Sequence, residues 1–356
     1  MSGPIVVHVV GTGTIGEPLI GILASYGKEL GIDEVTFHKR TPLTTDRSKV
    51  HALMKKGARL VTDKERHNDF IKLGMKPTLE TMEAFQRATV VIDCTPIGNK
   101  MKDEYYKNLN GNVKGFIAQG SEFGFGKMYA RGVNDKALKH GQDRFIQVVS
   151  CNTHNISVLI NTIAYDGGKR PDNLVDGRFI CIRRSSDISQ DEDFSPAPVV
   201  DKHKDETFGT HHARDAYHLF ETLGLKPRIF SSAIKLNTQY MHAIHFALKL
   251  KEKIDKNTVI DRLRSNAHVA VTDKKSANSI FSFGRDHGLY GRILSETVLS
   301  SPTLTVRDGD EVIGFCFTPQ DGNSLLSSVS AALWFINPET YEKKLEIFRP
   351  YMYAEV

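Results

Sequence analysis

Three glycines near the N-terminus have the spacing that dinucleotide-binding proteins use. Gly11, Gly13 and Gly16 form a GxGxxG between a β-branched run over 5–10 and an amphipathic pattern over 16–30. The first glycine permits a tight turn, the second lets backbone approach a pyrophosphate, and the third lets the helix pack on the strand. The helix N-terminus then offers unpaired N–H groups to the phosphates. The segment predicts a dinucleotide site, and a purely structural glycine turn is the alternative.

The end of the next predicted strand, over 34–39, bears on the choice of dinucleotide. NAD-selective sites usually place an Asp or Glu roughly 20 residues past the glycines, where it bonds the ribose 2′-hydroxyl. Lys39 and Arg40 stand there instead, and their charges suit a 2′-phosphate. We therefore predict NADP as the cofactor, with NAD possible. A solvated basic turn is the alternative, because lysine and arginine are common on surfaces.

Cys151 is placed for nucleophilic chemistry. It lies between a predicted strand over 145–149 and a predicted helix over 155–165. A thiol at a helix N-terminus has its thiolate stabilised by the helix dipole, which lowers its pKa. Most free cysteines are simply small buried hydrophobes, and that is the alternative. The four cysteines of the sequence include no CxxC pair, so we expect no zinc site and no redox dithiol.

The elements that must position these residues alternate between strand and helix over the first 150 residues. Predicted strands cover 5–10, 34–39, 89–93, 116–119 and 145–149. Such a βαβ series implies a doubly wound, mainly parallel sheet.

The pattern changes near residue 150. The helix over 155–165 is followed by an alternating segment over 178–183 that is typical of a half-exposed antiparallel strand. Further predicted elements are a loop over 185–210, strands over 233–237, 303–307 and 312–317, and helices over 324–334 and after Asn337-Pro338. The last two strands are joined through 308–310, a hairpin signal.

The predicted fold class is therefore α/β. An N-terminal Rossmann domain with a doubly wound parallel sheet covers 1–150, and an α+β catalytic domain with a mixed or antiparallel sheet covers 151–323. We expect the C-terminal helical stretch, about 324–356, to pack back on the first domain. A chain of 356 residues is also long for a single core.

Composition excludes several other classes of protein. Hydrophobic residues make up 40% and charged residues 25% of the sequence, so disordered, collagen-like and coiled-coil proteins are excluded. The net charge of +5 is spread along the chain, which suggests no nucleic-acid partner. No apolar run approaches the roughly 18 residues of a membrane span, and no signal peptide is evident. We expect a cytoplasmic protein with free thiols.

Longer segments resemble the archaeal-type (type II) glyceraldehyde-3-phosphate dehydrogenases along most of the chain. They occur in the family's order in both halves of the sequence. The segments are VGTGTIG at 10–16, KRTP at 39–42, DCTPIGN at 93–99, AQGSE at 118–122, VVSCNT at 148–153, RRSSD at 183–187, THHARD at 210–215 and YMHAIHF at 240–246.

The resemblance implies a Rossmann domain followed by a catalytic domain, and a homotetramer of such subunits. It makes Cys151 the nucleophile and His242 the base of a phosphorylating enzyme of glycolysis or gluconeogenesis. The implied substrates are a small phosphorylated aldehyde or acyl phosphate, with inorganic phosphate. The implied cofactor contacts are Gly11, Gly13, Thr14, Ile15, Gly16, Lys39, Arg40, Thr95, Gly120, Arg184 and Gln320, and the implied substrate contacts are Ser150, Asn152, Thr153, Arg183, His211 and His212.

The residue types fit this chemistry. A Cys151 thiolate would attack the aldehyde to give a thiohemiacetal, with His242 taking the proton and the N–H near Asn152 facing the oxyanion. Hydride would leave for the nicotinamide, and phosphate would attack the resulting thioester. Arginine and histidine donors can fix the anions.

Each of these residues also has a structural alternative. His242 among apolar neighbours could be a packed histidine, and Arg183 and Arg184 could pair with the acidic stretch 191–193. His211 and His212 could be metal ligands, but they have no carboxylate or cysteine at ligand spacing, so we expect no metal.

Departures from the family pattern leave other functions open. Val10 stands where the family has an asparagine, His154 stands where it has a small or hydroxyl residue, and the C-terminal third matches loosely. A CoA-acylating semialdehyde dehydrogenase with the same thioester chemistry is the alternative enzyme. A catalytically silent NADP-binding protein is the alternative outside enzymes, against which the presence of both Cys151 and His242 argues.

Overall fold

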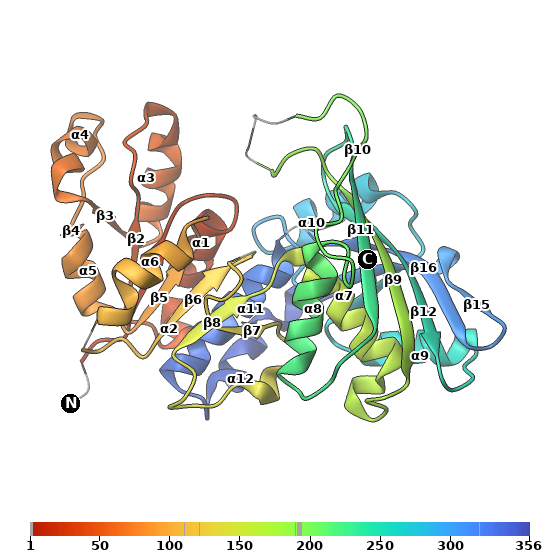
Figure 1. Cartoon of the computed structure of the whole chain (residues 1–356). Coiled ribbons are helices and arrows are strands. Elements are labelled where there is room, and N and C mark those ends of the chain that lie inside the picture. Colours follow the sequence, from red (N-terminus) through yellow and green to blue (C-terminus); the bar gives the residue numbers. More distant parts are fainter. Residues whose placement is uncertain (1–2, 110, 121, 189, 191–193, 320) are drawn as a thin grey trace. The chain divides into compact units, whose positions relative to one another are not determined.

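The computed structural model describes residues 3–109, 111–120, 122–188, 190, 194–319 and 321–356 (Figure 1). The chain forms two compact units. The first unit consists of 1–127, 139–148 and 327–347, and the second of 128–138, 149–326 and 348–356. Gln320, a predicted cofactor contact, lies outside the described residues.

The first sheet has the doubly wound topology that the sequence predicts. Its strand order is β4-β3-β2-β1-β5-β6-β8-β7, and β1 pairs in parallel with both β2 and β5. The order therefore reverses at β1, which is the feature that creates a ligand crevice in such sheets. The strands are β1 (Val6–Val10), β2 (Glu34–His38), β3 (Arg59–Thr62), β4 (Leu79–Glu80), β5 (Val90–Asp93), β6 (Gly115–Gln119), β7 (Lys127–Tyr129) and β8 (Phe145–Val148).

Helices connect the parallel strands of the first unit. The predicted helix over 16–30 is divided at Tyr26, whose φ of −110° and ψ of 12° interrupt the helical path. The connecting helices are α1 (Gly16–Ser25), α2 (Gly27–Leu30), α3 (Arg47–Lys55), α4 (His67–Lys72), α5 (Thr81–Arg87) and α6 (Gly98–Glu104). Helix α12 (Tyr341–Leu345), near the C-terminus, also belongs to this unit.

Helix α11 (Gly322–Ile336) confirms the predicted helix over 324–334. Within the first unit it packs against β6. Gln119 donates to Ser328 Oγ at 2.7 Å, and Lys114 donates to the Ile336 carbonyl at 2.8 Å. The ring of Phe335 occupies the space that a side chain at Gly115 would need.

The second sheet is mixed, with strand order β10-β11-β9-β12-β16-β14-β13 and β15 paired with β16. β9 pairs in parallel with β11 and antiparallel with β12. The predicted hairpin is confirmed, and Asp308 and Gly309 turn it with φ of 51° and 72°. The strands are β9 (Leu174–Arg183), β10 (Val199–Val200), β11 (Ile229–Lys235), β12 (His242–Leu250), β13 (Val269–Thr272), β14 (Thr297–Ser300), β15 (Thr305–Arg307) and β16 (Glu311–Thr318).

The core of the second unit lies between this sheet and helices α7 (Cys151–Leu159) and α8 (His211–Glu221), which pack side by side (Figure 1). β12 alternates strictly between buried and half-buried residues, so one face of the sheet supplies Ile244 and Phe246 to the core. The predicted helix over 155–165 begins earlier, at Cys151, and ends in a π-helical turn at Ile160–Ala164. The other helices are α9 (Lys256–Ser265) and α10 (Ala277–His287).

Among the described residues, no helix combines the length and apolar character that crossing a bilayer requires.

His8 is a buried polar group in the centre of the first sheet. Its Nδ1 lies 2.7 Å from Thr36 Oγ1, and its ring meets Phe85 edge-on. Burial, and secondarily the nearby His38, lower the pKa of His8 to about 3. The folded state therefore keeps this ring neutral under conditions in which the unfolded chain protonates it.

This difference predicts acid sensitivity of the first unit. Above about pH 6.5, the ordinary pKa of histidine in an unfolded chain, His8 is neutral in both states and does not lower the free energy of unfolding. As pH falls from about 6.5 toward the pKa of about 3 in the folded protein, only the unfolded chain binds the proton, so the free energy of unfolding falls. Replacing His8 by Gln should make the fall in stability between pH 6.5 and 4 shallower by up to about 1.4 kcal/mol per pH unit. The measurement is urea unfolding at several pH values, followed by the fluorescence of Trp334. This residue is the only tryptophan in the sequence and belongs to the first unit. Equal slopes in wild type and variant would contradict it.

Candidate active site

The glycine loop has the geometry that its sequence predicts. Gly11 adopts a φ of +95° and donates its N–H to the His38 carbonyl at 3.1 Å. A Cβ at Gly16 would lie 2.1 Å from the Gly11 oxygen, so only glycine lets α1 approach the loop. A Cβ at Gly13 would meet no described atom within 4 Å, which leaves room for a ligand to approach the backbone.

Other predicted cofactor contacts lie at the same edge of the sheet. β1, β5 and β6 are neighbours, and Gly11, Thr95 and Gly120 follow their carboxyl ends. Thr95 donates to Asp93 Oδ1 at 2.6 Å and packs against Gly11. Thr14 and Ile15 precede α1, which begins without a side-chain cap. A pyrophosphate fits this open helix start, because the backbone N–H groups there attract anions.

The basic turn after β2 is more organised than the sequence suggests. Lys39 is buried and forms an ion pair with Asp46, which also binds Lys49 at 2.9 Å. Burial opposes ionisation of Asp46, but the bonds from Lys39 and Lys49 lower its pKa overall. Lys49 also donates to the Thr12 carbonyl at 3.3 Å, so this ion cluster is tied to the glycine loop. Arg40 is exposed.

Sequence reasoning missed Asp46 and Lys49 as parts of this turn. Their i, i+3 spacing at the start of α3 was the available signal. It carried no indication that Asp46 would also bind Lys39, because that contact depends on the path of the chain between them.

Cys151 is the first residue of α7, as its position in the sequence predicts. Ser150 caps the helix, with its Oγ 3.4 Å from the Thr153 nitrogen and 2.9 Å from Thr153 Oγ1. Asn323 donates to the Cys151 carbonyl at 3.0 Å. The nucleophile candidate therefore lies at a capped helix start that is tied to Asn323.

The expected lowering of the Cys151 pKa is wrong. Although part of the residue reaches the surface, burial of the thiol and the neighbouring Asp321 carboxylate raise its pKa to about 12. The Arg184 charge and a hydrogen bond from the Asn152 N–H oppose this rise without overcoming it. The helix dipole is outweighed by desolvation, because a thiolate loses hydration in an enclosed site.

Asn152 is oriented by a chain of polar side chains in the second unit. Its Oδ1 accepts from Thr318 Oγ1 at 3.0 Å, and that hydroxyl accepts from Asn155 Nδ2 at 2.9 Å. Cys316 donates to Asn155 Oδ1 at 3.2 Å. The side chain of Asn152 is thereby occupied, and its backbone N–H is the group that contacts the sulfur.

His242 begins β12 and lies opposite Thr318 in the sheet register. Its Nδ1 accepts the Arg184 backbone N–H at 3.1 Å. Burial, followed by the charges of Arg184 and Arg183, lowers the pKa of His242 well below its ordinary value. The neutral ring must therefore carry its proton on Nε2, where it is a hydrogen-bond donor.

Arg184 is buried, and its guanidinium has partners within the second unit, although its Nε has no hydrogen-bond partner among the described residues. Its guanidinium contacts Asp187 at 2.8 Å, the Tyr240 carbonyl at 3.1 Å and Asp321 at 3.7 Å. Arg183 instead pairs with Asp201 at 2.9 Å. The suggested partner stretch 191–193 lies outside the described residues, and both arginines have other carboxylate partners.

His211 and His212 begin α8, with ring centroids 3.9 Å apart. Burial, then the charges of Arg183 and Arg214, lower the pKa of His211 to about 4. Burial also lowers the pKa of His212 strongly, and neither of its ring nitrogens has a hydrogen-bond partner among the described residues. In the part of the chain that the structure describes, no group of His, Cys, Asp or Glu could hold a metal ion.

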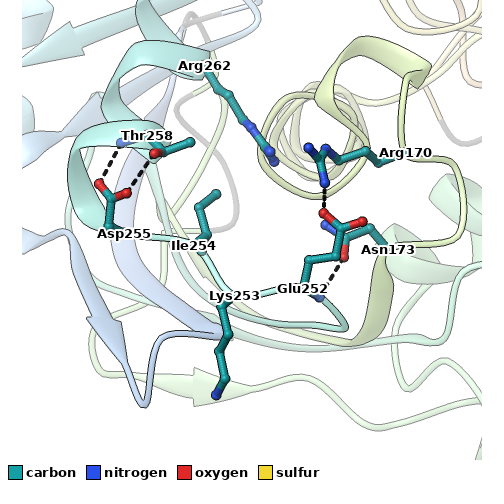
Figure 2. A pocket seen from close by; sticks show the side chains of 8 residues that line it. All are labelled: Arg170, Asn173, Glu252, Lys253, Ile254, Asp255, Thr258 and Arg262. Atoms are coloured by element: carbon teal, nitrogen blue, oxygen red, sulfur yellow. Dashed lines mark hydrogen bonds and ion pairs between the residues drawn. The ribbon is translucent and has the colours of Figure 1, made fainter.

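A polar pocket of about 410 Å³ lies elsewhere in the second unit, beside the start of α9. Figure 2 shows Arg170 directed at Glu252 and Asp255 at Thr258. Lys253, also on its wall, pairs with Asp310 at 2.8 Å. The pocket contains none of the predicted site residues, and its charged side chains largely neutralise one another.

Known proteins resemble this chain over most of its length. No protein-family model matches the chain. Glyceraldehyde-3-phosphate dehydrogenase of Pyrobaculum islandicum is 22% identical over 85% of this chain and 84% of its own. The enzymes of Methanobacterium formicicum and Aeropyrum pernix are each 26% identical, covering 85% and 91% of this chain and 86% and 90% of their own. Over most of its length the chain is therefore similar to archaeal glyceraldehyde-3-phosphate dehydrogenases.

Two departures from the glyceraldehyde-3-phosphate dehydrogenase pattern have structural explanations. Val10 is buried as the last residue of β1. His154 is fully buried in α7, with its Nδ1 3.0 Å from the Ser150 carbonyl, and burial lowers its pKa to about 4. Both residues act in packing.

The glycine loop supports a paired test. Gly13→Ala should leave the stability of the first unit within about 0.5 kcal/mol, because the new Cβ meets no atom, yet weaken dinucleotide binding about tenfold or more by blocking backbone approach. Gly16→Ala should destabilise the unit by about 1–3 kcal/mol, because the Cβ strikes the Gly11 carbonyl. Thermal unfolding and cofactor titration measure both. Unchanged cofactor affinity in Gly13→Ala would argue for a purely structural turn.

Proposed function

We propose that the chain is a phosphorylating, NADP-preferring glyceraldehyde-3-phosphate dehydrogenase that interconverts glyceraldehyde 3-phosphate and 1,3-bisphosphoglycerate through a thioester on Cys151. The similarity to curated dehydrogenases of that name supports it, as does the doubly wound sheet with its glycine loop. The observation that carries the proposal is the placement of Cys151 at the start of α7, where the Asn152 N–H contacts its sulfur.

In the first step the Cys151 sulfur attacks the aldehyde carbon, and the carbonyl oxygen becomes an oxyanion. The backbone N–H near Asn152 and the Nε2–H of His242 are the candidate donors to that oxygen. A donor role for His242 differs from the base role that the resemblance implies. The bond from Arg184 to Nδ1 favours it, because that bond leaves the neutral ring no free acceptor nitrogen.

The thiohemiacetal then loses hydride and becomes a thioester. A bound nicotinamide dinucleotide supplies the hydride acceptor. Inorganic phosphate attacks the thioester carbon, and the thiolate of Cys151 leaves as the acyl phosphate forms. The reverse sequence reduces an acyl phosphate.

Arg183, His211 and His212 are proposed to bind the phosphate groups of the substrate. The charge of Arg183 acts on both rings, and His212 is a buried group with unused polar atoms. Two neutral imidazoles can each donate one hydrogen bond to a phosphate oxygen. A phosphorylated triose suits this set of donors, and it favours the phosphorylating reaction over a CoA-acylating one. Ser150 and Thr153 form the capping pair beside Cys151.

A homotetramer is proposed for the assembly. The face of the second sheet opposite the core carries exposed apolar side chains, including Ile180 at 45% and Phe315 at 38% exposure. His245 lies between them in the sheet register. Exposed apolar side chains on one face of a sheet are common in contacts between subunits.

The function is tested by steady-state rates with glyceraldehyde 3-phosphate, phosphate and NADP, compared with reduction of a panel of acyl-CoA esters. Cys151→Ser should lower the rate below about a hundredth of wild type, since each 1.36 kcal/mol of barrier is tenfold. It should leave NADP binding nearly intact, because the glycine loop is unchanged. Cys181→Ala, which removes another thiol of the second unit, is the matched control.

Three outcomes would change this conclusion. Turnover with acyl-CoA esters but not with phosphate would favour the CoA-acylating alternative. Turnover that persists in Cys151→Ser would remove Cys151 as nucleophile. Cofactor binding without turnover of either substrate class would favour the alternative of a catalytically silent NADP-binding protein.

The cofactor preference is tested at the basic turn. Arg40 is exposed, whereas Lys39 is already paired with Asp46, so Arg40 should make the larger contribution to binding a 2′-phosphate. Arg40→Ala should weaken NADP about tenfold and leave NAD affinity unchanged, as expected for one screened charge-assisted bond. The matched control is Arg66→Ala, an exposed arginine beside Asp69. Equal or tighter NAD binding by the wild type at low ionic strength would contradict the preference.

A further inference from the structure

The thioester chemistry needs a proton acceptor, and His242 does not supply one. The Cys151 thiol is protonated at neutral pH, because burial raises its pKa to about 12. His242 has its Nδ1 occupied by the Arg184 N–H. Its Nε2 already carries the proton of the neutral ring, so this nitrogen donates and does not accept.

Asp321 is a buried carboxylate with an unused oxygen in the same region. The residue is 6% exposed. Its Oδ1 lies 3.7 Å from the Arg184 guanidinium, and its Oδ2 has no hydrogen-bond partner among the described residues. A buried carboxylate oxygen without a partner costs free energy, and this oxygen is free to accept a proton.

The backbone at Asp321 is strained as well. Its φ is +53°, a left-handed conformation that non-glycine residues adopt rarely and that concentrates at functional sites. Asp321 immediately precedes α11. Asn323, two residues on, donates to the Cys151 carbonyl, so the start of α11 is tied to the start of α7.

The charge of Asp321 also acts on the thiol. Among the charged groups that shift the titration of Cys151, Asp321 has the largest effect, ahead of Arg184 and Asp187. The groups that face Asp321 are Arg184 and Asp187 after β9, Arg292 before β14, and Cys151 on α7. Burial raises the pKa of Asp321 against the opposing charges of Arg184 and Arg292, which makes the carboxylate a stronger base.

We propose that the Asp321 carboxylate accepts the proton of the Cys151 thiol, directly or through one water molecule, when the sulfur attacks the aldehyde. This inference rests on the proposed function. The S–H bond breaks as the S–C bond forms, the proton moves to Asp321 Oδ2, and the carbonyl electron pair becomes the oxyanion held by the donors near Cys151. The proton leaves Asp321 for solvent after hydride transfer. In the reverse direction protonated Asp321 returns it to the departing sulfur.

Asp321→Asn tests this assignment, because asparagine keeps the size of the side chain and tolerates a positive φ. We expect kcat at pH 7 to fall about 100- to 10,000-fold, the range for loss of a general base. The deficit should shrink as pH approaches 10, because the thiolate then forms without a base. Asp321→Gly, which removes both the carboxylate and the backbone strain, should behave in the same way.

Iodoacetamide labelling of Cys151, followed by mass spectrometry, gives a readout independent of turnover. Removing the Asp321 charge should move the labelling midpoint of Cys151 to lower pH and so speed labelling at pH 8, while turnover falls. A loss of structure would also expose the buried thiols of Cys181 and Cys316 to labelling, whereas removal of the Asp321 charge should speed the labelling of Cys151 alone. Glu296→Gln is the matched control, because Glu296 is another fully buried carboxylate of the second unit without hydrogen-bond partners among the described residues.

The possible outcomes separate this assignment from the proposed function. If wild type turns over and Cys151→Ser does not, but Asp321→Asn keeps kcat within about threefold, Asp321 is not the base. A pH-independent loss with an unmoved labelling midpoint also overturns it. If the wild type shows no turnover that depends on Cys151, the proposed function fails. The labelling experiment then still tests Asp321, because an unmoved labelling midpoint in Asp321→Asn would show that Asp321 does not act on Cys151.

Discussion

Burial of the Arg184 guanidinium is the constraint around which the candidate catalytic centre is arranged. A buried cation is tolerated only when carboxylates and carbonyls replace its hydration. Asp187, Asp321 and the Tyr240 carbonyl do so here. The backbone N–H of the same residue occupies Nδ1 of His242. One residue thus contacts a buried carboxylate, fixes the tautomer of an imidazole and contributes to the electrostatic field at the Cys151 sulfur.

The charges around Cys151 and its burial explain why its thiol is protonated at rest. The carboxylates of Asp187 and Asp321 oppose a thiolate, and the effect of Asp321 on the thiol exceeds that of the Arg184 charge. The dipole of α7 and the Asn152 N–H favour the anion, but they act against desolvation, which is the larger effect. A thiol in this state resists oxidation, because the thiolate is the species that oxidants attack. Its nucleophilicity then depends on a base acting during the reaction.

The sequence predicted those parts of the protein that are determined locally. The glycine loop, the hairpin at 308–310 and the position of Cys151 at a helix start each depend on a few consecutive residues. Short strands such as β3 and β13 could not be predicted, because pairing with neighbours defines them. The pairing of Lys39 with Asp46, the tautomer of His242 and the oxygen left unpaired at Asp321 depend on residues distant in sequence. Desolvation of Cys151 has the same origin, which is why its pKa was predicted in the wrong direction.

Charge balance also bears on how a phosphorylated substrate would bind. Arg183 is paired with Asp201 at 2.9 Å, and burial keeps His211 and His212 neutral. An incoming phosphate would therefore compete with Asp201 for the Arg183 guanidinium and would meet imidazoles that donate as neutral dipoles. Hydrogen bonds from neutral donors are about half as strong as charge-assisted ones. We expect such a site to bind phosphate modestly, which would suit the proposed reversible reaction, because its donors would have to release the phosphate groups of substrate and product in both directions.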